Sequence, residues 1–418
     1  MRRFAYLLTS ALLVAAACNA LNGAGDLAIC QGNECNGAGP GAPIEAGSPA
    51  DGGGTIKDGT VTSETGAYDA TTCSECPEAC VSGTCTSWPS CAGGLKCGAS
   101  ATSCCESKPV PGGTFERANR SDESATLSPY RLDVYDVTVA RFRAFVAAGG
   151  GVASAAPPEG AGAHPRIPGS GWKQEWNVQL SNTTELFEDA LRGGTYTKAP
   201  GPNDSKPMTH MTWFEAFAFC AWDGGRLPTF AEWNFAAAGG DEQRVYPWSQ
   251  PPGSTAIDKT RASYECRYAE PAETCPPPKC VGATPAQLGT CNAATCVDAG
   301  GTCQDQGCFG CDEGADLAPV GMLPAGAGKY GQLDLAGNVG QFVLDAKPGS
   351  SDTDLPNPCN DCALLMGPQP QGTGGSGAYQ VYAVTGDWAD GAGDLRSWIF
   401  YPISYDERLD WMGFRCAR

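Results

Sequence analysis

Cysteine is the side chain most able to do chemistry in this chain, and it occurs 23 times in 418 residues. Only two histidines accompany these thiols, His164 and His210. Zinc sites need four ligands and often include histidine, whereas disulfides persist where cysteines meet an oxidising compartment. Three Cys-x-x-Cys pairs keep both interpretations open: Cys73/Cys76, Cys308/Cys311 and Cys359/Cys362. We favour disulfides, because the N-terminal sequence is typical of an exported protein and removal of Cys18 leaves an even number of cysteines.

The C-terminal stretch "VTGDWADGAGDLRSWIFYPISYDERLDWMGFRCAR", residues 384–418, holds a single cysteine, Cys416. The pair that precedes it, Cys359/Cys362, has the spacing of redox-active thiols. It lies, however, in the Pro-rich segment "LPNPCNDC" of a chain that we expect to be exported. We therefore predict a structural bridge for that pair.

Residues 1–18, "MRRFAYLLTSALLVAAAC", have the parts of an export signal, with Arg2 and Arg3 before an apolar stretch and small residues before Cys18. The stretch is shorter than the span of about 20 residues that a membrane helix needs. Alanines before a cysteine resemble a bacterial lipobox, in which that cysteine is lipidated, although Ala15 stands where leucine is usual. Ordinary signal cleavage nearby is the alternative. We expect an exported lipoprotein of the cell envelope, at the outer membrane or cell surface, that meets the membrane through its lipid anchor only.

The charge balance narrows the classes of partner. A formal net charge of −19 would repel nucleic-acid phosphates. We therefore expect no nucleic-acid partner. Acidic loops are also compatible with calcium.

The composition predicts four parts of unequal character. Residues 19–70 are rich in Gly, Ala, Pro and Ser and predict a flexible linker. Residues 71–107 hold eight cysteines but few large apolar side chains, which predicts a small disulfide-rich module that serves as a stalk or, alternatively, as a binding module. From residue 108 to 418 the composition is that of a folded domain, interrupted by a cysteine-rich insertion at about 265–312.

Three helices can be placed in this domain by their ends. The segment after Thr138 carries apolar residues at helical spacing and stops at glycines from 149. Thr212 with Glu215, and Thr229 with Glu232, have the spacing of capping boxes. Strand-like pieces such as "YRLDVYDV" and "QVYAV" are short. We expect a mixed α+β domain with little regular structure for its size.

Several ordered blocks carry a family resemblance: "PVPGGTF", "PMTHMTWFEAFAFCAWDGGRLPTFAEWNFAAAGGDEQRVYPWS", "YGQLDLAGNVGQFVLD" and "GFRCAR". Together they resemble the formylglycine-generating enzyme, or sulfatase-modifying factor, domain family over about residues 108–418, less the insertion. The segments "SCCESKPVPGGTF" and "GAGAHPRIPGSGW" are similar to those of exported myxobacterial proteins of this layout. The resemblance implies an irregular α+β fold related to C-type lectins.

The resemblance also implies where catalysis would occur. Active members oxidise a sulfatase cysteine to formylglycine with two copper(I)-binding cysteines, and thiolates suit that soft ion. The corresponding positions fall near Asp390 and Leu395, and neither is cysteine. Copper is therefore not expected, and the stretch is similar to the larger, non-oxidase branch of the family. A further branch uses iron held by three histidines, which this chain lacks.

Two further features are implied by the resemblance. Family members bridge the positions of Cys220 and Cys416. They also bind calcium in the Gly-Asn-Val block, where the ligands here would be the Asp334 side chain, the carbonyl groups of Gly337 and Val339, and Gln341. Gln341 replaces a glutamate, which weakens the site by one charge. A calcium-free turn is the alternative.

The functional expectation is a non-catalytic domain that binds an envelope protein, a peptide or a glycan. Four aromatic residues could line a ligand groove, since they give contact area with a polar handle, or could belong to the core: Trp388, Trp398, Tyr401 and Tyr405. The alternative function is a protein-modifying oxidase that converts a sulfatase cysteine to formylglycine or does related chemistry. A surface receptor with variable loops is a third hypothesis.

Overall fold

A computed structural model of the chain describes residues 88–266, 268, 316–348, 355–367 and 379–418, together with the backbone of five short strands elsewhere. The chain divides into two compact units, Met1–Ser87 and Trp88–Arg418. The predicted signal peptide with Cys18, the linker over 19–70 and most of the insertion at 265–312 lie outside the described residues.

The three helices expected from their caps are confirmed, as α2 (Val139–Ala147), α4 (Trp213–Trp222) and α5 (Phe230–Ala238). Both capping boxes form: Thr212 and Thr229 each accept from the third backbone amide of the helix, and Glu215 and Glu232 accept from the cap's own amide. A further helix, α3 (Thr184–Ala190), was not predicted, because it is short and buries only Phe187.

The sheets are small, as the short strand patterns predicted. A four-stranded sheet has the order β15 (Phe400–Ser404), β14 (Tyr379–Val384), β12 (Gly340–Pro348), β16 (Met412–Gly413). A three-stranded sheet orders β13 (Cys359–Asn360), β8 (Ser124–Leu127) and β7 (Gly113–Glu116). Two pairs complete the body: β6 (Ser107–Val110) with β9 (Tyr130–Asp133), and β4 (Lys96–Cys97) with β5 (Thr102–Ser103). Elsewhere, β1 (Leu27–Ala28), β2 (Ala79–Val81) and β3 (Thr84–Thr86) form one sheet, and β10 (Lys279–Val281) pairs with β11 (Thr302–Gln304).

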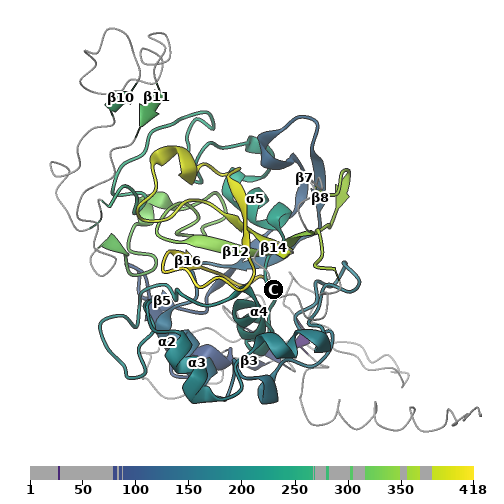
Figure 1. The fold of residues 1–418 in the computed structure, drawn as a ribbon. Helices are drawn as coiled ribbons and strands as arrows, with labels where there is room; N and C mark the ends of the chain where they lie inside the picture. Colours follow the sequence, from purple (N-terminus) through teal and green to yellow (C-terminus); the bar gives the residue numbers. More distant parts are fainter. Residues whose placement is uncertain are drawn as a thin grey trace, which may run out of the picture. The chain divides into compact units, whose positions relative to one another are not determined.

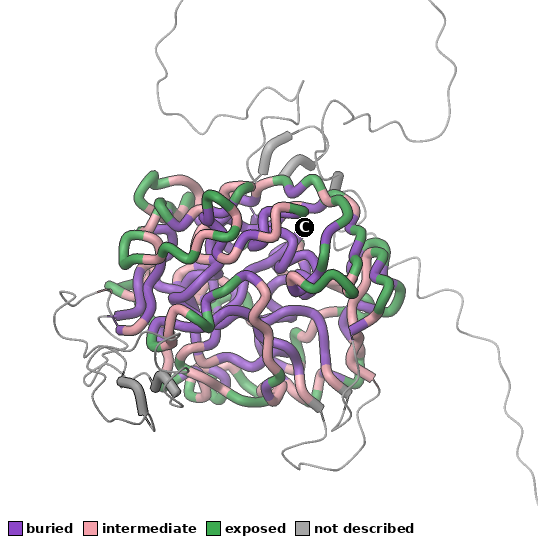
Figure 2. Tube along the Cα trace, turned by 90° about the horizontal axis from the view of Figure 1, so that it is seen from above, coloured by how far each residue is buried: buried purple, intermediate pink, exposed green. Residues whose placement is uncertain are grey.

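The four-stranded sheet separates two hydrophobic clusters, because successive side chains of a strand point to opposite faces. Phe342 and Leu344 of β12 pack in the cluster that contains α2 and α4, whereas Val343 packs in the cluster that contains α5. In Figure 1, α2, α3 and α4 lie to one side of β12 and β14, and α5 lies to the other, beside β7 and β8. Figure 2 shows buried segments through the middle of this body and exposed ones around its rim.

The segment from Trp88 to Cys105 belongs to the same compact unit as the helices. Disulfides Cys91–Cys105 and Cys97–Cys104 close it. The sequence predicts a separate cysteine-rich module over residues 71–107. The second compact unit begins at Trp88, so the part of that module from Trp88 onwards belongs to the domain. No sequence pattern marked this boundary, because the contacts that hold the segment come from distant parts of the chain.

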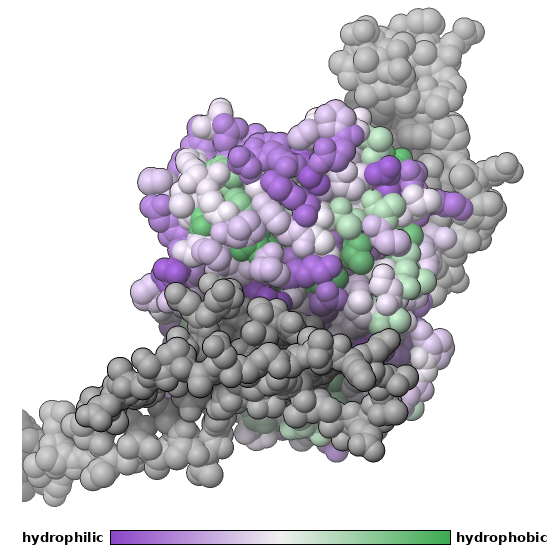
Figure 3. Space-filling model, turned by 180° about the vertical axis from the view of Figure 1, so that it is seen from behind, coloured by the Kyte–Doolittle hydropathy of each residue, from purple (hydrophilic) through white to green (hydrophobic). Residues whose placement is uncertain are grey.

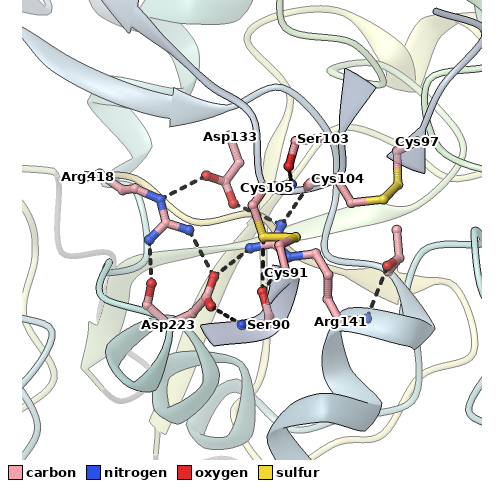
Figure 4. The surroundings of a disulfide bond; sticks show 11 residues. Ser90, Cys91, Cys97, Ser103, Cys104, Cys105, Asp133, Arg141, Asp223 and Arg418 are labelled. Atoms are coloured by element: carbon pink, nitrogen blue, oxygen red, sulfur yellow. Dashed lines mark hydrogen bonds and ion pairs between the residues drawn. A yellow bond between two sulfur atoms is a disulfide. The ribbon is translucent and has the colours of Figure 1, made fainter. Parts of the chain in front are cut away.

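Those contacts are a network of buried charges (Figure 4). Arg141 of α2 donates to Asp133 Oδ2 at 3.1 Å and to Asp223 Oδ2 at 2.7 Å. Arg418 donates to the same two carboxylates, at 3.2 Å and 3.0 Å. Ser90 joins them through its backbone amide, 2.9 Å from Asp223 Oδ1. The network therefore ties the segment that begins at Trp88 to α2, to the end of α4 and to the C-terminal residues.

A disulfide joins Cys220 of α4 to Cys416, the pair that the family resemblance implied. Both cysteines are fully buried in the cluster of α2 and α4. None of the described helices has both the length and the apolar character that crossing a bilayer requires.

Candidate functional site

The positions near Asp390 and Leu395, where the family resemblance would place a pair of copper-binding cysteines, lie in a loop that follows β14. Its backbone is fixed on two sides: the Trp388 amide donates to Asn338 O at 3.1 Å, and the amides of Glu265 and Cys266 donate to Asp390 O and Trp388 O. Inside the loop, Asp390 Oδ2 accepts from the Asp387 amide at 3.0 Å. The loop thus has a defined shape, set by backbone hydrogen bonds with Glu265, Cys266 and Asn338.

Both positions make contacts within the protein. Asp390 closes the turn at Asp387, and Leu395, at the end of the 3-10 helix Ala392–Leu395, is fully buried with Tyr246 and Ala336. Cys416 is the sole cysteine of residues 384–418, and its sulfur is bonded to that of Cys220. A thiolate pair for copper(I) is therefore absent from this loop.

Carboxylates gather in this loop and alter the acidity of their neighbours. Burial, followed by repulsion from Asp390 and Asp410, raises the pKa of Asp387 to about 7. Burial and the charges of Asp387, Asp390 and Asp394 raise the pKa of Tyr401 well above its usual value. Tyr401 donates to Thr385 O at 3.1 Å. The loop can thus exchange a proton at Asp387 near neutral pH, while Tyr401 stays protonated.

This environment predicts how stability depends on pH. Because the pKa of Asp387 is raised from 3.8 to about 7, the folded state binds that proton more tightly than the unfolded state does. Its contribution to stability is present at low pH and is lost as pH rises towards about 7. Asp345, with a pKa raised to about 6 by burial, acts in the same direction. We expect the melting temperature to fall between about pH 4 and about pH 7 and to level off above that, and D387N to make that fall shallower in a fluorescence melt.

The matched control is D122N, which removes an equal charge from a side chain that is 74% exposed. Water solvates Asp122 in both states, so D122N should reproduce the slope of the unmodified protein. A D387N slope equal to that of D122N would contradict the assignment.

Two of the predicted calcium ligands, Gln341 and Asp334, have side chains that already bond to protein groups. Gln341 Oε1 accepts from Trp233 Nε1 at 2.9 Å and from Arg415 Nε at 2.8 Å. Asp334 Oδ2 accepts from the Gly321 amide at 2.6 Å, and burial raises the pKa of Asp334. A guanidinium on the oxygen that would bind a dication opposes binding there, so Gln341 does not fit as a ligand. Calcium at these positions stays a prediction.

Metal ligation is not favoured elsewhere in the part of the chain that the structure describes. It contains no group of three or more His, Cys, Asp and Glu side chains placed to hold a metal ion.

The four aromatic residues predicted to line a groove lie in different surroundings. Trp388 is buried with Val339 and Leu317, and Trp398 packs on the cluster of α5. Tyr401 and Tyr405 are both half-buried against the cluster of α2 and α4. The structure therefore brings the two tyrosines to one cluster and places the tryptophans in others.

Sequence reasoning missed the contacts of Arg408, which lies on the segment that leads to β16. Arg408 donates to both carboxylate oxygens of Glu215 and to His210 O at 3.1 Å. Burial and the positive charge of Arg408 lower the pKa of His210. Nearly 200 residues separate Arg408 from these partners, so no local pattern could have signalled the contact.

Comparison with known proteins assigns the sequence to a family. Residues 97–418 match the family described as "Sulfatase-modifying factor enzyme 1-like domain". The chain belongs to this family.

Relatives in this family include proteins with and without the named activity. The chain is 32% identical over 165 residues to a "Formylglycine-generating enzyme" of Thermomonospora curvata. The matched region covers 33% of this chain and 50% of that protein. It is 27% identical over 175 residues to an "Inactive C-alpha-formylglycine-generating enzyme 2" of Bos taurus, with 33% and 50% covered. The chain thus spans about half the length of these curated relatives.

Among solved structures, the chain is similar to PvdO from Pseudomonas aeruginosa, with a TM-score of 0.42 and 17% identity over 75% of this chain and 94% of that one. A likeness at this level supports no argument about activity.

Proposed function

We propose that this protein is an exported, lipid-anchored envelope protein whose sulfatase-modifying-factor domain binds a protein, peptide or glycan and does not oxidise a sulfatase cysteine. The single observation that carries the proposal is the chemistry of the loop after β14. An aspartate and a buried leucine stand where the oxidase needs two thiolates, and Cys416 is in a disulfide.

Three properties support a binding role on an envelope protein. The N-terminal pattern that ends at Cys18 is typical of a lipoprotein. The C-type-lectin-related framework that the family resemblance implies tolerates variation in its loops. Tyr401 and Tyr405 are only half-buried, so each keeps part of its surface exposed.

Catalytic activity is tested directly with a sulfatase peptide that carries the target cysteine. The full-length protein, with its disulfides intact, is incubated with the peptide, copper(I) and oxygen, and aldehyde is measured by mass spectrometry. We expect none, while an active formylglycine-generating enzyme run in parallel converts the peptide. Aldehyde formation would overturn the proposal in favour of the oxidase.

Binding is tested by screening the same protein on arrays of envelope glycans and peptides. We expect a ligand whose binding is lost in Y401A and Y405A, at melting temperatures that confirm folding. V178A is the matched control, because Val178 is 81% exposed and lies in another segment, the 3-10 helix Gln174–Gln179. Equal loss in all three variants, or no ligand, would count against this site.

A further inference from the structure

A Cys-x-x-Cys disulfide lies at the edge of the three-stranded sheet, apart from the loop discussed above. Cys359 and Cys362 are bonded to each other. Cys359 is 1% exposed and pairs with Ala125 of β8, whereas Cys362 is half-buried. Cys359 is thus shielded from solvent, whereas Cys362 keeps part of its surface exposed. That asymmetry suits an exchange reaction, in which one sulfur meets a partner and the other resolves the product.

A buried guanidinium contacts the accessible sulfur. Arg117 Nη1 donates to Cys362 Sγ at 3.5 Å, and the Arg117 side chain is only 1% exposed. Arg117 opens a 3-10 turn, Arg117–Asn119, between β7 and β8, and that turn is anchored to α5 by the Ala118 amide, 2.7 Å from Asn234 Oδ1. The position of the guanidinium is therefore fixed by the hairpin and by α5, independently of the disulfide.

Among the contacts that the structure describes, Arg117 is the only cation that touches the Cys362 sulfur. Arg117 also pairs with Glu123, and its Nε has no partner. Asp361, between the cysteines, is held by Ser128 and lies 3.6 Å from Arg166 Nε. Asp345 accepts from the amides of Phe230 and Leu364. Asp361 and Asp345 thus have partners of their own, whereas Glu123 shares Arg117 with Cys362: one arm of the guanidinium pairs with Glu123 and the other donates to Cys362 Sγ.

We propose that Cys359–Cys362 is a thiol–disulfide exchange site, with Cys362 as the reacting sulfur and Arg117 as the residue that stabilises its thiolate. A cation beside a thiol favours the thiolate, which is the reactive form. In the oxidised protein, a partner thiolate attacks Cys362 Sγ, the S–S bond breaks, and Cys359 leaves with the electron pair and takes up a proton. A second partner thiol then attacks the mixed disulfide, so two partner thiols become one disulfide and the protein gains two thiols.

The reverse reaction uses the same roles. The Cys362 thiolate attacks a partner disulfide, and Cys359 resolves the mixed disulfide by attacking Cys362 Sγ. The co-reactants are cysteine-containing proteins or small thiols, and no electron acceptor other than their disulfides is needed.

This bridge is expected to contribute little to the stability of the fold. The sequence separation of its cysteines is 3, against 196 for Cys220–Cys416. Constraint of the unfolded chain grows with loop length, so the short bridge adds the least. The strand that it closes, β13, has two residues.

The first test asks which sulfur reacts. Full-length C359S and C362S are incubated with oxidised glutathione under native conditions, and mixed disulfides are mapped by mass spectrometry. We expect glutathione on Cys362 in C359S and none on Cys359 in C362S. The reverse pattern, or no adduct in C359S, would overturn the proposal.

The second test separates the thiolate role of Arg117 from a structural one. In the C359S background, the rate of Cys362 alkylation is followed from pH 5 to pH 10. R117Q should move the profile to higher pH and slow alkylation at pH 7 about threefold for each unit that the thiol pKa rises, since higher basicity offsets about half of the lost thiolate. R117K, which keeps the charge, should restore most of the rate. Identical profiles for all three proteins would overturn the role of Arg117. If R117Q does not fold, the profile of R117K and the result of the first test decide.

Discussion

Replacing Arg141 with alanine is expected to lower the free energy of unfolding by about 3–5 kcal/mol, because removal of one partner leaves buried charges without compensation. Arg141, Asp133 and Asp223 are all 0% exposed. Arg141 also donates to Ser90 Oγ at 3.0 Å and to Cys104 O at 3.2 Å. Its loss therefore removes the common partner of two carboxylates, and Arg418 alone remains to neutralise both. Urea unfolding, followed by tryptophan fluorescence, measures the change.

The matched control lies two residues away on the same helix. Arg143 pairs with Asp204 at 2.6 Å, but the two side chains are 16% and 34% exposed. Water screens such a pair, so R143A should cost about 1 kcal/mol or less. If R141A and R143A proved equally mild, the buried network would not be what holds the segment from Trp88 to α2.

Local signals in the sequence sufficed for the helices. Thr212 with Glu215, and Thr229 with Glu232, predicted α4 and α5 because a capping box uses only residues three apart. Helix α3 escaped prediction because Leu186 lies on its surface, 56% exposed, so it lacks a continuous apolar face. Figure 3 shows hydrophobic residues in separate groups among hydrophilic ones on the face drawn.

The candidate site was predictable from the sequence only where it depends on residue identity at single positions. The missing thiols could be noted from the sequence, since the comparison needs only the positions of Asp390 and Leu395. The raised pKa of Asp387 could not be predicted, because its largest cause is burial, which the packing of distant segments sets; the charges of Asp390 and Asp410 add to it. Likewise, the contact between Arg117 and Cys362 spans 245 residues. Long-range partners of this kind leave no periodicity or local motif.

The second large effect is expected from C220A/C416A. The closed loop has a sequence separation of 196, and the chain-entropy model gives about 5 kcal/mol for a loop of this length, with measured values commonly about 2–5 kcal/mol. Both cysteines are fully buried in the cluster of α2 and α4, so alanine avoids placing two hydroxyl groups there. We expect a loss of about 2–5 kcal/mol in urea unfolding.

The matched control is C359A/C362A, because its two cysteines have a sequence separation of only 3. The same model assigns that bridge about 2 kcal/mol, so the loss should be smaller than in C220A/C416A. If the two double variants lost equal stability, the long bridge would not be constraining the unfolded chain. A large loss in C359A/C362A would moreover mark its bridge as a structural clamp, which is the role that the exchange reaction does not require. The two disulfides are therefore expected to differ in kind: one stabilises the domain across its length, and the other is free to open while the domain stays folded.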